Sequence, residues 1–233
     1  SAFGFDALQA NTSGSNNHAF GNYALLNNTT GDGNVAMGIY SLKSNTTGEF
    51  NISIGGQSLE DNNGSFNVSV GTAALQKNTS GNHSIGIGHF ALNKNTTASR
   101  NIAIGSHALE NNTGTENTAL GYHALASNTV ANQNTAIGAY SLYSNVNGDN
   151  NIAIGHDALR NNSSGNRNVA LGYHALRSNT TAQYNTATGD RTLKDNTTGQ
   201  YNTANGSSAL EANQNGNYNT ATGSYALSRN SSG

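Results

Sequence analysis

A glycine recurs along the whole chain at almost constant spacing, and this repeat constrains the fold more than any other feature of the sequence. Each glycine follows a tripeptide of small and apolar residues, and successive glycines are 17 residues apart except for two intervals of 16. We interpret residues 1–233 as a single array, either a fragment of a longer fibrous protein or a unit that stacks end to end. The fourteen repeating glycines are Gly4, Gly21, Gly38, Gly55, Gly71, Gly88, Gly105, Gly121, Gly138, Gly155, Gly172, Gly189, Gly206 and Gly223.

Several other positions of the unit are nearly constant when they are numbered from this glycine. Leucine stands at +4 in every unit, and asparagine stands at +7 in most of them, as in Asn11 and Asn145. A second asparagine stands at −4, with Ser84 as the exception. In the two shorter units the missing residue falls after the +7 asparagine, so the register is kept. A residue type that recurs at one position occupies an equivalent environment in each unit.

The repeat length favours a β-solenoid. Seventeen residues are too few for a pair of packed helices or for a leucine-rich repeat. We therefore expect an all-β chain of fourteen coils, each 16–17 residues long. The predicted strand is the run Asn101–Gly105, in which Ile102 and Ile104 point to one face. Ala103 and Gly105 point to the other face, where small residues permit another backbone to approach closely.

The remainder of each unit is predicted to be connection and turn. The segment after the glycine, such as residues 122–127, could form a helical turn or a second strand, because so short a piece has no decisive periodicity. The Asn-Thr-Thr-Gly that follows is typical of a turn. Stacked coils would place equivalent asparagines about 4.8 Å apart, so their amides can form ladders. We interpret the N-x-S/T sequons at Asn45 and Asn179 as ladder positions and not as glycosylation sites.

Composition excludes several classes of protein. Charged residues make up only 9% of the chain, the net charge is −2, and Leu, Ile, Val and Phe together number 39 beside 41 Asn. So few large apolar residues disfavour an ordinary globular core, and the low net charge disfavours a disordered tail. No apolar run suits a membrane helix, so no direct membrane insertion is expected. The sequence lacks a basic patch for nucleic acid, and without cysteine it cannot form disulfides or thiolate metal sites.

The residue before each glycine suggests that chains associate. Large apolar residues occupy this position from Phe3 to Leu171, whereas the last three units have Thr188, Asn205 and Thr222. An enclosed core would not accept an asparagine without a partner. A face shared between chains, or one open to water, accepts it more easily. We therefore expect association around a common axis.

The strand motif, in Asn101–Gly105 and Asn168–Gly172, resembles the head repeats of YadA-like trimeric autotransporter adhesins. The longer unit, as in residues 185–199, is similar to arrays in phage tail-fibre-like and bacterial surface proteins with a C-terminal intramolecular chaperone domain. Adhesin heads are left-handed parallel β-rolls in which three chains pack side by side, and their repeat is shorter than this one. The resemblance implies a homotrimeric fibre that is extracellular, on a cell surface or on a virion. It also implies attachment to a glycan or another host-surface receptor, and it supplies no catalytic residues.

No motif for catalysis or for a cofactor stands out. The glycines lack the Lys-Ser/Thr of a phosphate loop, and Glu60 beside Asp61 is not the converging pair of a glycosidase. Residues 147–150 carry only a fragment of the β-helix calcium pattern. His107 and His123 share one column in neighbouring coils, and a threefold axis could also gather three copies of one histidine around a metal. The other residue types in that column indicate exposed surface. We predict no enzyme activity, no cofactor and no metal site. A lyase on a β-helix would need clustered charges at one level.

Two surface columns are candidates for ligand binding. The first is aromatic in five units at position −5, where a stripe of rings could hold sugars or another protein, or could only stabilise the coils by packing. These residues are Phe50, Phe66, Tyr184, Tyr201 and Tyr218.

The second column pair is a threonine array in the last three units, formed by Thr186, Thr188, Thr203, Thr220 and Thr222. Regularly spaced outward hydroxyls suit an ice-binding surface, and a partly wet trimer interface is the other interpretation. The sequence as a whole predicts a non-enzymatic structural and adhesive fibre or stalk-head module that binds through its variable columns. An ice-binding or surface-lattice solenoid is the alternative.

Overall fold

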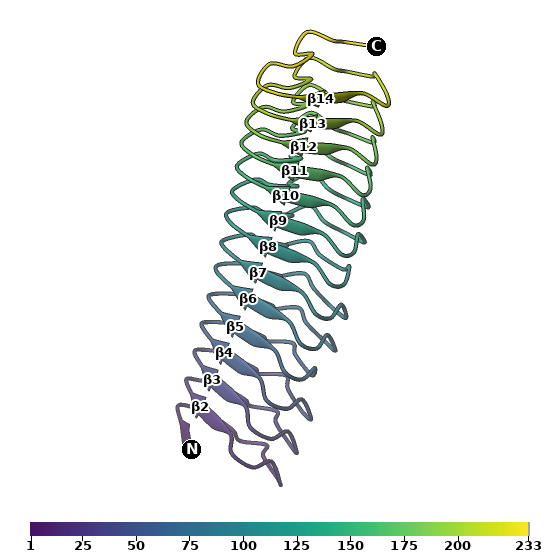
Figure 1. Cartoon of the computed structure of the whole chain (residues 1–233). Helices are drawn as coiled ribbons and strands as arrows, with labels where there is room; N and C mark the ends of the chain where they lie inside the picture. Colours follow the sequence, from purple (N-terminus) through teal and green to yellow (C-terminus); the bar gives the residue numbers. More distant parts are fainter. Residues whose placement is uncertain (233) are drawn as a thin grey trace. The chain divides into compact units, whose positions relative to one another are not determined.

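The computed structural model describes residues 1–232 and confirms the predicted all-β solenoid, because each unit of the repeat forms one coil with one short strand (Figure 1). The chain divides into two compact units, Ser1–Glu116 and the part that begins at Asn117. No helix long and apolar enough to cross a membrane occurs in the described residues.

Within each of these two compact units, called the first and the second unit below, the strands are parallel and pair in the order of the sequence. The register never slips, so the inward residue of each strand faces the inward residue of the next, as Ala36 faces Ser53 and Gly86 faces Ala103. The first unit holds β1 (Ala2–Phe3), β2 (His18–Phe20), β3 (Val35–Met37), β4 (Ile52–Ile54), β5 (Val68–Val70), β6 (Ile85–Ile87) and β7 (Ile102–Ile104). The second unit holds β8 (Thr118–Leu120), β9 (Thr135–Ile137), β10 (Ile152–Ile154), β11 (Val169–Leu171), β12 (Thr186–Thr188), β13 (Thr203–Asn205) and β14 (Thr220–Thr222).

The apolar core of a coil consists of one leucine and two small residues. The +4 leucine, such as Leu92 or Leu159, is fully buried, and so are the small residues at −2 and +3, such as Ala103 and Ala108. The leucine has a left-handed backbone, with φ of 52° at Leu92 and 50° at Leu159. This conformation costs a non-glycine residue about 1–2 kcal/mol, which is offset by the roughly 2 kcal/mol gained when a leucine side chain is buried.

The segment after the repeating glycine is neither a helical turn nor a second strand. It consists of consecutive turns, in which the backbone N–H of Ala74 donates to the carbonyl of Gly71 and that of Asn78 donates to Leu75. Other backbone groups of the same segment bond to the next coil, as Leu75 N–H does to the carbonyl of Ala91 at 2.9 Å. Successive coils are thus joined by backbone hydrogen bonds outside the strands as well as within them.

Two buried asparagine ladders confirm the role predicted for the amides. At +7, the side-chain amide of Asn45 donates to Asn28 Oδ1 at 2.8 Å and to the carbonyl of Gly48 at 3.0 Å. At −4, Asn51 Nδ2 and backbone N both donate to Asn34 Oδ1 at 3.0 Å. The sequon asparagines Asn45 and Asn179 are fully buried, which fits their interpretation as ladder positions.

The shorter coils lose their residue from the turn that follows the +7 ladder. In a 17-residue coil the amide of Asn45 bonds the carbonyl three residues ahead, whereas Asn62 bonds the carbonyl of Gly64, only two residues ahead. Asn62 still donates to Asn45 at 3.4 Å and accepts from Asn78 at 2.6 Å. The ladder therefore runs through the short coil without a break.

The repeating glycine is required by the close approach of coils. At Gly88 φ is +130°, and an added Cβ would lie 2.6 Å from the carbonyl oxygen of Gly105. The observed strand has three residues, Ile102–Ile104, where five were predicted. It is shorter because the −4 asparagine belongs to the ladder and the glycine begins the turn. The side chains at −3 and −1 point outward, and the small residue between them points into the coil, as predicted.

Candidate functional site

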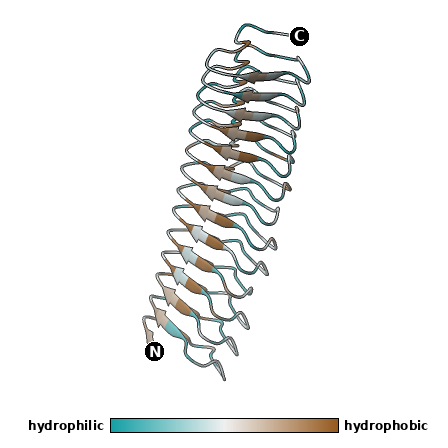
Figure 2. Ribbon diagram, in the orientation of Figure 1, coloured by the Kyte–Doolittle hydropathy of each residue, from teal (hydrophilic) through white to brown (hydrophobic). Residues whose placement is uncertain are grey.

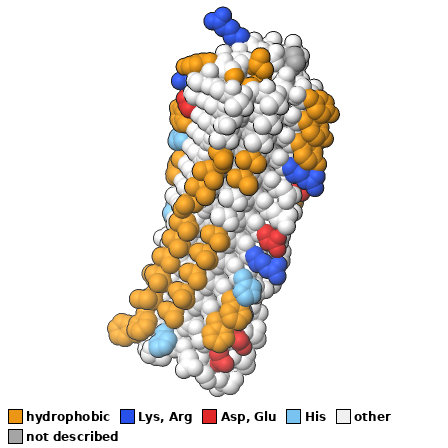
Figure 3. Space-filling model, viewed as in Figure 1, with side chains coloured by type: hydrophobic (Ala, Val, Ile, Leu, Met, Phe, Trp, Pro, Cys, Tyr) orange, Lys and Arg blue, Asp and Glu red, His pale blue; other side chains and the backbone are white. Residues whose placement is uncertain are grey.

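The outward side of the strands is an apolar face, which we call the strand face and define by the residues at −3 and −1. Side chains here remain 36–44% exposed at Phe20, Met37, Ile54, Ile87 and Ile104. Neither position carries Asp, Glu, Lys or Arg in any coil. Figure 3 shows hydrophobic side chains as a continuous band over this face of the first unit. Single apolar residues scattered over a surface are common, whereas a contiguous apolar band such as this one indicates an interaction surface.

The strand face changes character within the second unit. Strands β10 and β11 present apolar residues, whereas β12 to β14 present threonine and asparagine, and Figure 2 shows the change in hydropathy. Thr186, Thr203 and Thr220 are in register on neighbouring strands, and so are Thr188, Asn205 and Thr222. The structure thus brings the predicted threonine array together on one surface. Asn205 interrupts one of its two rows.

The predicted aromatic residues at −5 form two separate stacks, one in each unit. The rings of Phe50 and Phe66 are stacked at 5.5 Å between centroids, and His83 continues the stack at 5.0 Å. The ring of Phe50 also covers Gly33, where an added Cβ would lie 2.6 Å from the ring. His83 stands at the same −5 position, and the predicted aromatic stripe did not include it.

In the second unit, Tyr184, Tyr201 and Tyr218 stack with centroids 5.0 Å apart and with interplanar angles of 5° and 4°. Arg167 caps the stack, because its guanidinium lies 5.4 Å from the Tyr184 ring centroid and its Nη1 donates to the Tyr184 hydroxyl. The ring faces therefore cover one another, and the open parts are ring edges and hydroxyls. A sugar that needs a bare aromatic face finds one only at the outer ring, Tyr218, which is 76% exposed.

A shallow polar hollow lies beside the capped end of this stack. It has a volume of about 250 Å³ and is lined by Asp149, Asn150, Asn166, Arg167 and Gln183. Side-chain amides, a carboxylate and a guanidinium here offer both donors and acceptors, which suits the hydroxyls of a sugar or the backbone of a peptide. No protein-family model, curated protein or solved structure gives a match to this chain.

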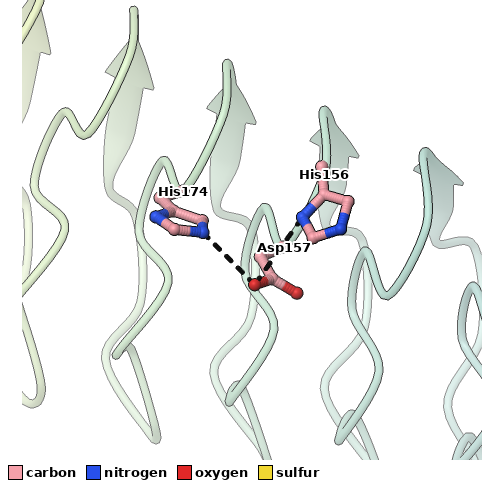
Figure 4. A group of neighbouring side chains, drawn as sticks. All are labelled: His156, Asp157 and His174. Carbon is pink, nitrogen blue, oxygen red and sulfur yellow. Dashed lines mark ion pairs between the residues drawn. The ribbon is translucent and has the colours of Figure 1, made fainter.

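One group of side chains in the described residues has the composition and spacing of metal ligands. His156, Asp157 and His174 each offer one ligand atom, and these atoms lie within 4.8 Å of one another (Figure 4). Burial, reinforced by the charge of Arg177, lowers the pKa of His174. Comparing histidines within a single column misses this group, since His156 stands at +1 and the other two at +2 of successive coils. Aligning neighbouring coils residue by residue would have found it.

Proposed function

We propose that this chain is a non-enzymatic structural and adhesive module, whose copies associate through the strand face and which attaches to partners through the variable columns of its coils. Its place would be outside the cell, on a cell surface or on a virion. The observation that carries this proposal is the strand face, which is apolar at both positions from β3 to β7 and carries no Asp, Glu, Lys or Arg in any coil, although its side chains reach the surface.

The energetics support association of copies through this face. In the first unit twelve apolar side chains point outward from the strands. Covering the exposed part of each would contribute about 1 kcal/mol, or on the order of 10 kcal/mol in all. This gross gain is comparable with the roughly 4–15 kcal/mol that association costs in lost translational and rotational freedom. A second and a third copy of the same chain offer the same apolar surface without Asp, Glu, Lys or Arg.

Sedimentation equilibrium with charge substitutions tests the association. Native protein should have a mass near three times 24.0 kDa. A double variant, Ile54→Lys with Ile87→Lys, should sediment as a monomer, because association would bury two ammonium groups without partners. Gln57→Lys adds one such ammonium group at an exposed position outside the strand face and should leave the mass unchanged. Native protein that remains monomeric at micromolar concentration would contradict the proposal.

Attachment through the variable columns is supported by the tyrosine stack and the adjoining hollow. Stacked rings present a row of phenolic hydroxyls next to the polar groups of the hollow, a combination that can bind a glycan at ring edges. A glycan array should therefore report binding that is lost in Tyr184→Ala. It should weaken in Tyr184→Phe, which keeps the ring and removes only the hydroxyl. Equal binding by all three proteins would limit the stack to stabilising the coils.

An ice-binding or surface-lattice solenoid is the second candidate, and the register of the threonines on β12 to β14 favours it. Replacing Thr188 and Thr222 by tyrosine should abolish thermal hysteresis and ice shaping if this surface binds ice. Native protein without thermal hysteresis would exclude this candidate and leave the proposal for the strand face untouched.

A further inference from the structure

The cluster around Asp157 lies at the surface of the second unit and takes no part in the strand face or the tyrosine stack. The carboxylate is almost enclosed, with a side-chain exposure of 5%. Asp157 lies in the turn that follows β10, and His156 precedes it directly in the chain. His174 reaches it from the next coil and stands 17 residues after Asp157 in the sequence. Figure 4 shows both imidazoles directed at the carboxylate from opposite sides.

The distances within the cluster match the edges of a metal coordination shell. Asp157 Oδ2 lies 3.3 Å from His174 Nε2 and 3.7 Å from His156 Nδ1. A tetrahedral ion with bonds of about 2.1 Å separates its ligand atoms by about 3.4 Å. The two histidine nitrogens are within 4.8 Å of each other. Since the His156 side chain is half exposed, a small rotation can close this last edge.

We propose that His156, Asp157 and His174 form a binding site for a transition-metal ion, to which Zn²⁺ is best suited. Two imidazoles and one carboxylate are ligands that Zn²⁺, Co²⁺ and Ni²⁺ accept, whereas Ca²⁺ and Mg²⁺ prefer sites made of oxygen alone. Three protein ligands leave a coordination position open to water, on the exposed side of His156. The site is independent of the proposed association of copies, because none of its ligands lies in the strand face.

Two arginines contact the same carboxylate and act on the ion in different ways. Arg160 Nη1 lies 3.3 Å from both Asp157 carboxylate oxygens. It can therefore keep its hydrogen bond to Oδ1 while Oδ2 binds the ion. Hydrogen bonding to the second oxygen is the usual way in which a ligating carboxylate is oriented. Arg177 Nε lies 3.5 Å from Oδ2 and has no hydrogen-bond partner there. Its side chain is 35% exposed and can move into water when the ion binds. Its charge opposes the ion, so the affinity is moderate.

The first unit contains a natural counterpart that lacks the central carboxylate. His89 and His107 occupy the same two positions in successive coils, with ring centroids 5.6 Å apart, and Phe90 stands where the second unit has Asp157. The corresponding rings of His156 and His174 are 6.4 Å apart. The two histidine pairs therefore differ in the residue between them, which is the ligand Asp157 in the second unit and the non-ligand Phe90 in the first.

Calorimetric titration with Zn²⁺ tests the site in the full chain. Native protein should bind one equivalent, and Ca²⁺ or Mg²⁺ should not compete. His156→Ala and His174→Ala should each weaken binding at least tenfold, while the matched control His89→Ala should leave the affinity unchanged. Equal loss in His89→Ala, or one-to-one binding that persists in both cluster variants, would overturn the proposal. Failure of native protein to bind Zn²⁺ at millimolar concentration would overturn it as well.

A charge substitution separates a metal site from a purely structural ion-pair cluster. Arg177→Gln should tighten Zn²⁺ binding by about fivefold, since it removes a positive charge beside Oδ2. Arg167→Gln removes the same charge from the tyrosine stack and should leave the affinity unchanged. The visible absorption of bound Co²⁺ gives a second readout, which should disappear in Asp157→Asn even if this variant stays folded. Unchanged affinity in Arg177→Gln, or unchanged Co²⁺ absorption in Asp157→Asn, would contradict the site.

Discussion

Replacing a single ladder asparagine should destabilise the second unit strongly, and Asn151→Ala is the sharpest case. The side chain of Asn151 is fully buried. Its Nδ2 donates to Asn134 Oδ1 at 3.2 Å and to the carbonyl of Gly165 at 2.8 Å. Its Oδ1 accepts the backbone N–H of Asn168 at 2.9 Å and the Asn168 side-chain amide at 3.1 Å. Truncation to alanine removes all four hydrogen bonds.

The magnitude depends on which partners are left unpaired. The Gly165 carbonyl keeps the amide of Asn162 at 2.9 Å, and Asn134 Oδ1 keeps the backbone N–H of Asn151 at 2.9 Å. The Asn168 side-chain amide keeps a backbone carbonyl at 2.9 Å. The backbone N–H of Asn168 has no second acceptor in the described residues. One buried orphan donor costs 1–3 kcal/mol and each replaceable bond somewhat less, so the variant should lose about 3–4 kcal/mol.

A serine at the same position should recover part of this loss, because the first unit already contains one. Ser84 occupies the ladder position there, and its Oγ accepts the backbone N–H of Asn101 at 3.3 Å. In Asn151→Ser the hydroxyl can accept the N–H of Asn168 in the same way. We therefore expect Asn151→Ser to be about 1–2 kcal/mol more stable than Asn151→Ala.

Hydrogen exchange is the assay suited to these variants, because solenoids unfold locally and one global free energy does not describe them. The Asn168 amide should exchange fastest in Asn151→Ala, more slowly in Asn151→Ser and slowest in native protein. Thermal unfolding should follow the same order. Equal exchange of this amide in the alanine and serine variants would refute the reasoning, because it would mean that the orphaned donor contributes nothing.

Three further predictions concern the backbone, the stack and the cluster. Gly138→Ala should lower the free energy of unfolding by at least about 3 kcal/mol in a denaturation experiment, because φ is +125° and the new Cβ would lie 2.6 Å from a carbonyl oxygen. Gly56→Ala is the control and should be neutral, because its new Cβ would have no atom within 4 Å. Tyr201→Ala removes two ring stackings and should lower unfolding stability by about 1–3 kcal/mol, and an unchanged melting temperature would argue against the stack. In metal-free protein, NMR titration should place the His174 pKa below its ordinary value of 6.5, so that the ring stays neutral to a lower pH. Burial is the larger cause of this lowered pKa and the charge of Arg177 the second, so Arg177→Gln should raise the pKa part of the way, and no change would contradict the contribution of the arginine.

The fold could be predicted because the repeat supplies its own alignment. The leucine at +4, the asparagines at −4 and +7 and the glycine all have roles that follow from their residue type once the coils are stacked. The conformation of the segment between Gly71 and Asn78 could not be predicted, since its turns depend on left-handed backbone at Ala73 and Leu75. Neither alanine nor leucine is a residue whose type indicates that conformation.

The surface could be predicted by column but not by orientation. Tyr184, Tyr201 and Tyr218 were expected to share a stripe, and they do. That their faces cover one another follows from the ring planes, which the sequence does not specify. The cluster at Asp157 was missed for a different reason, because its members come from two adjacent columns and become neighbours only when one coil lies on the next.

The shorter coils have a consequence for how such a chain can be enlarged or redesigned. Because Asn62 keeps its place in the ladder while the turn to Gly64 loses a residue, length varies at this turn without shifting the rest of the coil. Coils that differ by one residue at this turn therefore still stack in register. The same turn is a natural insertion point for a foreign loop, which would be displayed at one chosen level of the array.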